Sequence, residues 1–528
     1  MRDMKKLMLI GLVGLILASC STRTGHLTGV LVRPMYYPEI PLGMVYVPSG
    51  AYNMGENDQD VPFLHQTVAK TVSVQAFYMD QTEISNNEYR QFVQWVRDSI
   101  ARDKIYINEN DRTSGYKNEE WSDDDAKAWI NYQDMYFDEA TMEYVEYDPS
   151  DRVLGREMFN LNWDRPINYE DPKLVPLLAD MYYPQPERFF RRKEIDTRKL
   201  MYKYYWVDLI EAAKRGRINI TPDGYDNQGE KIVQEHRTLE SPPHPYTKDP
   251  QGQDLDLGHF NKKGQNNAIR GHEDRSRFII DEMINVYPDT LCWIRDFTYS
   301  FHDPMTKMYF WHPSYDNYPV VGVTWFQAKA FSIWRTQLLN SWLVSMGEIF
   351  VNDFRLPSEA EWERASRGDL ALSPYPWGGP YIRNEAGCFL GNFKPMRGRY
   401  FEDGGFHTVK VFSYNPNGWG LYCMAGNVAE WCETAYDESM NEFSHDLNTD
   451  YKYDAMDWDP PSMKRKVLRG GSWKDIGYYL QNSTRTYEYQ DSAKSYIGFR
   501  DVMTHLGRGG RDFTKEGGEE IQGDIQLR

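Results

Sequence analysis

Cysteine and histidine are scarce in this sequence. Only five cysteines and 11 histidines occur among 528 residues, and no two histidines have the His-x-x-x-His spacing that binds a metal on one helix face. Cys423 and Cys432 have no second pair to complete a zinc site, so they indicate structural residues. Together with Cys292 and Cys388 they allow three full disulfide pairings, and the sequence does not choose among these pairings.

Positive charge and long apolar runs are lacking too. The formal net charge is −18, which argues against nucleic acid as a partner, because binding phosphates needs a basic face. After the N-terminus, no stretch approaches the roughly 20 apolar residues that span a bilayer. Aromatic residues, in contrast, make up 15% of the chain. They predict large cores and surfaces suited to protein contact.

The N-terminus has the pattern of an export signal. Arg2, Lys5 and Lys6 precede an apolar run, Leu7 to Leu17, that has the length of a secretory signal. The run ends in Leu17-Ala18-Ser19-Cys20, which resembles a bacterial lipobox. That resemblance implies a signal peptide over residues 1–19 and a lipid on Cys20. The alternative is an ordinary signal peptide with an incidental cysteine.

The residue after Cys20 bears on location. An aspartate there would resemble the signal for retention in the inner membrane, and this chain has Ser21. We therefore expect a protein anchored by its lipid to the outer membrane and facing the periplasm. Residues 20–40 are polar and contain proline, which is typical of a tether, and the Gly-rich, charged residues 504–528 are typical of a flexible tail.

Three capping boxes predict where helices begin. They are Ser85 to Glu88, Thr324 to Gln327, and Ser358 to Glu361. Short apolar runs before them predict strands at Met44–Pro48, Val72–Met79 and Pro319–Val323. Short strands and helices joined by long connections indicate an α+β fold.

The segment 97–310 differs from its surroundings, with acidic and aromatic runs that indicate one large insertion. Apolar residues at helical spacing predict a helix over Lys199–Lys214. The aromatic residues of the insertion have two interpretations. They could form a second core over the domain, or they could form a contact surface for neighbouring subunits.

An ordered series of motifs lies on both sides of this insertion. It covers residues 41–96 and 311–503 and resembles the formylglycine-generating enzyme (sulfatase-modifying factor) family. The resemblance implies a loop-rich α+β fold related to C-type lectins. The main motifs are Phe77-Tyr78-Met79-Asp80, Arg355-Leu356-Pro357-Ser358-Glu359, Gly426-Asn427-Val428-Ala429-Glu430-Trp431, Arg469-Gly470-Gly471-Ser472-Trp473 and Ile497-Gly498-Phe499-Arg500.

A narrower resemblance adds a cellular setting. The lipobox, the domain, the acidic insertion and phrases such as Tyr309-Phe310-Trp311-His312-Pro313 and Gly387-Cys388-Phe389 are similar to the GldK (PorK) family of gliding-motility lipoproteins. Membership would imply a structural role in type IX secretion and gliding motility. It would also imply self-association in a periplasmic ring with a partner of the GldN/PorN type.

The wider family binds copper with a cysteine pair between its Gly-Gly-Ser and Gly-Phe-Arg motifs. Here that interval is Trp473 to Ile497, and it contains no cysteine. Because Cu(I) prefers thiolate ligands, we expect neither copper nor enzymatic activity. Two alternatives stay open: an oxidase with an altered pocket, and a module that binds glycans such as peptidoglycan.

Calcium is the metal that the resemblance favours. Family calcium sites lie in two loops, where turns that carry Asn, Asp and Glu can present several oxygens to a hard cation. Metal-free turns held by Asx hydrogen bonds are the alternative. The matching residues are Asn392, Phe393, Asp403 and Gly405 in one loop region, and Gly426, Val428 and Glu430 in the other.

Overall fold

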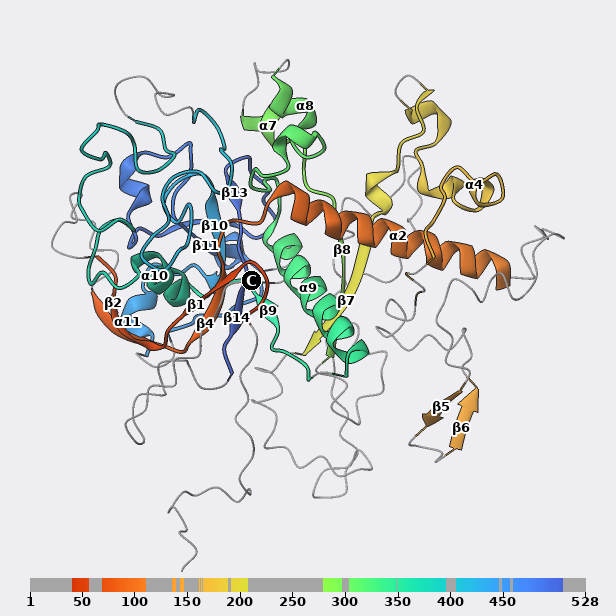
Figure 1. Ribbon diagram of the computed structural model, residues 1–528, viewed down its shortest axis with the longest axis horizontal. Coiled ribbons are helices and arrows are strands. Elements are labelled where there is room, and N and C mark those ends of the chain that lie inside the picture. The colour runs from red at the N-terminus through yellow and green to blue at the C-terminus, as the bar shows by residue number, and fades with distance from the viewer. Residues whose placement is uncertain are drawn as a thin grey trace, which may run out of the picture. The chain divides into compact units, whose positions relative to one another are not determined.

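The computed structural model is shown as a ribbon in Figure 1. Ile40–His505 form one compact unit. Cys20, the signal peptide and nearly all of the predicted tail lie outside the described residues. The described residues are 40–56, 69–110, 135–138, 143–146, 161, 163, 165–188, 191–207, 279–296, 303–347, 349–395, 405–445, 449–455 and 459–506.

Two four-stranded sheets carry most of the motifs. The first is antiparallel and has the order β1 (Met44–Val47), β4 (Phe77–Asp80), β14 (Val502–Thr504) and β9 (Phe354–Arg355). The second has the order β12 (Thr486–Tyr489), β11 (Arg465–Arg469), β10 (Ala429–Ala435) and β13 (Ile497–Gly498), with β10 and β13 parallel. Because β4 pairs with β14, motif segments more than 400 residues apart fold as one domain.

The remaining described elements are short strand pairs and helices. The strand pairs are β2 (Gly50–Met54) with β3 (Lys70–Val74), β5 (Met135–Asp138) with β6 (Glu143–Glu146), and β7 (Met201–Val207) with β8 (Ile279–Asn285). The α-helices are α2 (Asn86–Asn110), α4 (Leu174–Leu177), α7 (Cys292–Asp296), α8 (Pro304–Met308), α9 (Trp325–Ser345), α10 (Glu359–Arg367) and α11 (Met440–Phe443). This mixture of helix and sheet agrees with the predicted α+β class.

All three predicted helix starts are confirmed. At α2, α9 and α10 the N–H of the capping Ser or Thr donates to the Glu or Gln three residues later, at 2.7 to 2.9 Å. The N–H of that Glu or Gln donates back to the hydroxyl at 3.3 Å. Each box thereby satisfies two donors that the first helical turn would leave bare.

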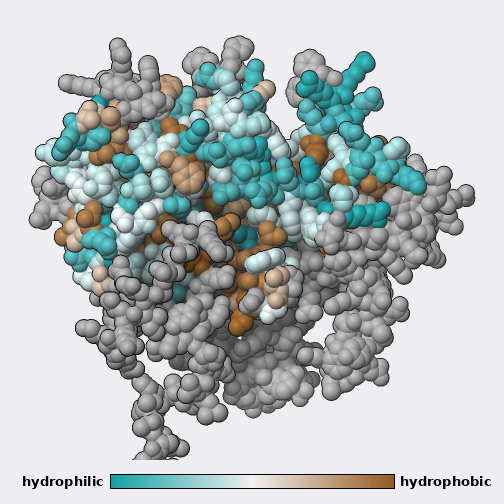
Figure 2. All heavy atoms as spheres, viewed as in Figure 1, coloured by the Kyte–Doolittle hydropathy of each residue, from teal (hydrophilic) through white to brown (hydrophobic). Residues whose placement is uncertain are grey.

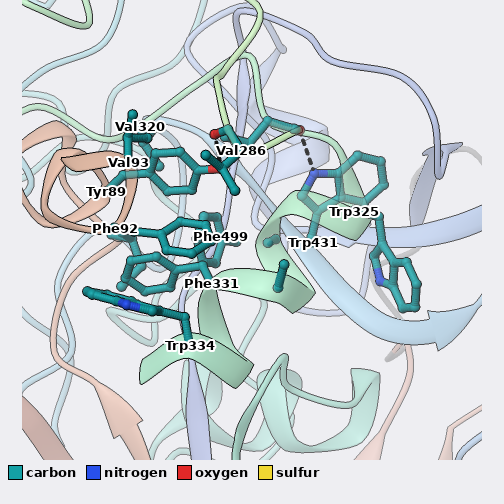
Figure 3. Close-up of a cluster of buried hydrophobic side chains, with 14 of the residues drawn as sticks. Tyr89, Phe92, Val93, Val286, Val320, Trp325, Phe331, Trp334, Trp431 and Phe499 are labelled. Carbon is teal, nitrogen blue, oxygen red and sulfur yellow. Dashed lines mark hydrogen bonds between the residues drawn. The ribbon is translucent and has the colours of Figure 1, made fainter. Parts of the chain in front are cut away.

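Aromatic side chains from α2 and α9 form the centre of the main core (Figure 3). Tyr89 stacks on Phe331, with ring centroids 5.6 Å apart, and Phe92 packs on Trp334 at 5.1 Å. The Tyr89 hydroxyl donates to the carbonyl of Val286 at 3.0 Å. The core therefore depends on α2, on α9 and on a residue from the predicted insertion.

The described parts of the segment 97–310 are continuous with the domain. α2 crosses position 97, where the insertion was predicted to begin, and continues to Asn110. Leu200, Tyr202 and Tyr204 belong to the main core. Among the described residues, aromatic side chains of this segment thus serve the core, in line with the first of the two interpretations.

The helix predicted over Lys199–Lys214 is wrong. Met201–Val207 form strand β7, and the residues after it lie outside the described part of the chain. Tyr202 and Tyr204 are buried on one face, which is the period of two expected for a strand. The partner strand β8 is more than 70 residues away, so a local pattern could not reveal the pairing.

Two of the predicted strands also need correction. The run Val72–Met79 is divided between β3 and β4, which belong to different sheets. The run Pro319–Val323 makes only an isolated bridge, between Pro319 and Ser85. Gly322 has a φ of 76°, which ends extended structure in this run.

The C-terminal end of α9 carries an apolar surface. Figure 2 shows hydrophobic residues gathered near the middle of the drawn face, over this helix end and the turn that follows it. We call this set the α9 stripe; it contains Leu338, Trp342, Met346, Ile349 and Phe350, which are 44 to 68% exposed. Within the described ranges, no helix is long and apolar enough to cross a membrane.

The two faces of α9 predict different costs for truncation. Phe331→Ala should lower the free energy of unfolding by about 3–5 kcal/mol, because it leaves a cavity between α2 and α9. Leu338→Ala, on the exposed side of the same helix, should change it by less than about 1 kcal/mol. Denaturant unfolding of both variants measures the difference, and equal losses would contradict the assigned core.

Candidate functional site

The segment from Trp473 to Ile497 is where the family resemblance puts a catalytic cysteine pair. It follows Gly470 and Gly471, whose φ angles are 90° and 68°. A Cβ on Gly471 would lie 2.7 Å from the carbonyl oxygen of Tyr479, so only glycine allows this close approach. The turn leads into the 3₁₀ helix η9 (Gly477–Leu480) and then into β12.

Apolar side chains fill the space around η9. Leu480 is 1% exposed and lies in a cluster with Tyr375, Phe389 and Phe393. The Tyr375 hydroxyl donates to the carbonyl of Gly477 at 3.0 Å, which fixes the cluster to this turn. A Cu(I) site needs thiolates, and here the interval supplies a packed leucine.

The polar side chains of the same interval are used for internal bonds. The Asn482 amide donates to the carbonyl of Ser373 at 3.0 Å and accepts from the Ser366 hydroxyl at 2.7 Å. Arg485 donates to Glu359 at 2.5 Å. These groups hold loops against α10 and are buried.

Arg469 and α10 form the centre of a buried charge network. The Arg469 guanidinium lies 2.6 Å from Glu359 and 2.9 Å from Glu363. Burial alone would raise the pKa of Glu359, but Arg469 and Arg485 outweigh it and hold that pKa below its ordinary value. Sequence reasoning found the capping box of α10 but not this network, although paired Glu and Arg residues in successive motifs were its signal.

The network also binds a loop from the start of the chain. Glu363 accepts from the N–H of Gly55 at 2.9 Å, and Arg367 donates to the carbonyl of Gly55 at 2.7 Å. Arg367 in turn pairs with Glu363 at 2.7 Å. The end of β2 is therefore fixed to α10 by charged hydrogen bonds.

Glu430, one of the predicted calcium residues, lies in a second buried pair. Its carboxylate accepts from the Arg500 guanidinium through both oxygens, with Nε at 2.7 Å. The Trp362 indole N–H donates to the same carboxylate at 2.6 Å. In this geometry Glu430 does not fit a calcium ligand, because Arg500 already neutralises it.

Glu83 is a neighbouring buried carboxyl that sequence reasoning did not single out. It accepts from the Asn427 amide at 2.6 Å and from the backbone N–H of Val428 at 3.2 Å. Burial, and then the charge of Glu430, raise its pKa well above the ordinary value. Its only sequence signal was a charged residue directly before a buried turn.

The two predicted calcium loops meet at Asn392. Its carbonyl accepts from the N–H of Asn427 at 2.8 Å, and its amide donates to the carbonyl of His407 at 2.7 Å. A Cβ on Gly426 would lie 2.4 Å from the Asn392 carbonyl oxygen, and one on Gly405 would lie 2.7 Å from Asn392 Oδ1. Glycine at both positions thus permits the contact.

The other predicted calcium residues are divided. Phe393 packs in the cluster around Leu480, and Val428 lies in a separate core cluster with Trp473. Asp403 lies outside the described residues. Over the described ranges, no three His, Cys, Asp or Glu side chains are grouped as a metal ion would need. Calcium therefore stays a prediction, and the loops around Asn392 fit it better than Glu430 does.

The four cysteines of the described region are free. Cys292, Cys423 and Cys432 are buried, and Cys388 is exposed. Burial raises the pKa of the Cys423 and Cys432 thiols well above the ordinary value, which keeps them protonated and unreactive.

Comparison with known proteins decides the family. The family model described as "Sulfatase-modifying factor enzyme 1-like domain" matches residues 38–143 and 299–505, more than half of the chain. The chain belongs to this family. The match leaves out most of the segment that the sequence marked as an insertion.

Curated family relatives match in part. The chain is 34% identical over 195 residues to "Formylglycine-generating enzyme" of Streptomyces coelicolor, covering 35% of this chain and 52% of that protein. It is 34% identical over 190 residues to "Inactive C-alpha-formylglycine-generating enzyme 2" of Bos taurus, covering 35% and 49%. It is 33% identical over 188 residues to "Serine/threonine-protein kinase pkn1" of Chlamydia pneumoniae, covering 36% and 24%.

The chain thus spans about a quarter to a half of the length of these relatives. Among solved structures, "Structure of PvdO from Pseudomonas aeruginosa" matches 36% of this chain and 63% of that chain, with 21% identity and a TM-score of 0.28. At this score the likeness supports no conclusion about function. Since the relatives include one named an enzyme and one named inactive, membership of the family leaves catalysis open.

Breaking the network at α10 should be costly. Glu363→Gln leaves Arg469 and Arg367 with less negative charge in a buried site, and we expect a loss of about 3–5 kcal/mol in the free energy of unfolding. The control is Glu385→Gln, at an exposed position, which should cost less than about 0.5 kcal/mol. Denaturant titration compares them, and a neutral Glu363→Gln would contradict the network.

The calcium prediction has a direct test. If calcium binds the loops around Asn392, a chelator should lower the melting temperature and calcium should copurify at a fixed ratio, because a ligand of the folded state stabilises it. Asn392→Ala should abolish both effects, whereas Glu430→Gln should keep the copurified calcium. Unchanged melting and no bound metal would rule the prediction out.

Proposed function

We propose that this chain is a non-catalytic scaffold protein of the outer membrane, anchored by lipid at Cys20 and facing the periplasm. In this proposal it forms a ring with a partner of the GldN/PorN type, as part of the type IX secretion and gliding-motility machinery. Peptidoglycan is a further candidate contact, and nucleic acid is not a partner. The resemblance to gliding-motility lipoproteins supplies the setting.

One observation carries the non-catalytic part of the proposal. In the interval that would hold the catalytic cysteines, Leu480 is buried in an aromatic cluster and Asn482 and Arg485 bond to neighbouring loops. A cysteine-based copper oxidase has no ligands there. The family relative named inactive is in keeping with a fold that persists without chemistry.

The α9 stripe supports the assembly part of the proposal. Its five large apolar side chains are 44 to 68% exposed within 13 residues of chain. Clustered exposed apolar groups of this kind mark protein contacts in soluble domains. A structural subunit of a ring needs such a surface on each copy.

Gentle extraction of the membrane tests the proposal. The wild-type chain should leave the membrane as a large ring-shaped particle with a stoichiometric partner, as seen by mass measurement and electron microscopy. Cys20→Ala should move the chain to the soluble periplasmic fraction, because the lipid supplies the anchor.

Variants of the stripe sharpen this test. Ile349→Asp with Phe350→Asp should break the particle into smaller species, because the substitutions place charges in a buried contact. Tyr381→Asp, at a residue that is 76% exposed elsewhere, should leave it intact. A solitary wild-type monomer would contradict the ring. Bound copper with oxygen consumption on a cysteine peptide would favour the altered oxidase instead.

A further inference from the structure

Two tight turns of the domain present apolar side chains at their tips. In the first, Met44 N–H donates to the Pro41 carbonyl at 3.1 Å, Gly43 has a φ of 79°, and Leu42 is 97% exposed. In the second, which runs from Lys410 to Ser413, the Ser413 N–H donates to the Lys410 carbonyl at 2.9 Å. The tip of this second turn carries Phe412, which is 59% exposed. Turn tips usually carry Gly, Asn, Asp or Ser, so the local turn chemistry does not explain a leucine and a phenylalanine.

The two turns are joined through Gln81. Its N–H donates to the Gly43 carbonyl at 2.9 Å, and its carbonyl accepts from the Tyr422 N–H at 2.8 Å. The Tyr422 ring then packs on Phe412, with centroids 5.3 Å apart. Both turns are thus held to one strand end of the first sheet. We call Ile40, Leu42, Phe412 and Tyr422 the turn patch.

The position of the turn patch in the chain points to its occupant. Ile40 is the first residue of the compact unit and is 51% exposed, and it follows Cys20 by 20 residues. A segment of that length reaches at most about 70 Å. If Cys20 carries a lipid, the turn patch is therefore confined near the bilayer, and even a weak contact with it is favoured by the high effective concentration.

The chemistry of the turn patch fits a lipid surface. Aliphatic and aromatic side chains with a tyrosine hydroxyl are typical of protein surfaces that enter the interface between headgroups and acyl chains. Lys410, which is exposed next to Phe412, can meet an anionic headgroup. The second sheet and the α9 stripe do not take part in this set.

We propose that the turn patch inserts Leu42 and Phe412 into the membrane interface and so fixes the orientation of the domain on the bilayer. This inference rests on the proposed lipid anchor. It adds a second, non-covalent contact, and it predicts which face of the domain is turned to the lipid and which is left for protein partners.

The test anchors the chain without relying on Cys20. The mature chain with Cys20→Ala and an N-terminal histidine tag is bound to protein-free vesicles of phosphatidylethanolamine and phosphatidylglycerol that contain a nickel-chelating lipid. Hydroxyl-radical footprinting then measures side-chain oxidation with and without vesicles. We expect oxidation of Leu42 and Phe412 to fall at least about threefold on vesicles. Phe443, which is 58% exposed, should not change.

A second measurement follows release of the chain after EDTA is added. Leu42→Ser with Phe412→Ser should dissociate at least about tenfold faster than wild type, while Phe443→Ser should match wild type. Oxidation of Leu42 and Phe412 that stays equal to that of Phe443 would overturn the proposal, as would protection that needs an added membrane protein. Since the tag replaces the lipid, a failure at Cys20 appears only in fractionation and is distinguishable from a failure of the turn patch.

Discussion

The buried pairing of Arg469 with Glu359 and Glu363 is the constraint on which much of this domain depends. The sheets are small, with strands of two to seven residues, so regular hydrogen bonding secures only a part of the chain. Long connections must therefore be fixed by side chains. A charged group that is buried and fully paired does this well, because removing one partner leaves an uncompensated charge.

The same constraint explains how the family motifs can exist without family chemistry. Glu359 from α10, Arg469 from β11, and Glu430 with Arg500 all lie in motifs that mark the family, and all are occupied with holding loops together. The position of the catalytic thiols is separate from these pairs and is filled by Leu480 and its aromatic neighbours. A chain can therefore keep the motifs for shape and lose the thiols.

With its interior occupied in this way, the domain offers function through its surfaces. The α9 stripe and the turn patch belong to different elements, one on the far end of a core helix and the other on two turns beside the first sheet. Their chemistry differs as well, since the stripe is a contiguous apolar set and the turn patch combines turn tips with a tyrosine and a lysine. A lipid contact on one and a protein contact on the other would let a ring subunit face the membrane and its neighbours at once.

The sequence alone determined the features that depend on near neighbours. The capping boxes of α2, α9 and α10 and the α+β class follow from residues within one turn or one motif of each other, and the missing cysteines between Trp473 and Ile497 can be read directly. Only the tertiary structure decided that Met201–Val207 is a strand, that Pro319–Val323 is not, that Asn392 joins two distant loops, and that Glu430 pairs with Arg500. These outcomes depend on partners up to hundreds of residues away, and contacts at that separation leave no periodic signal in one sequence.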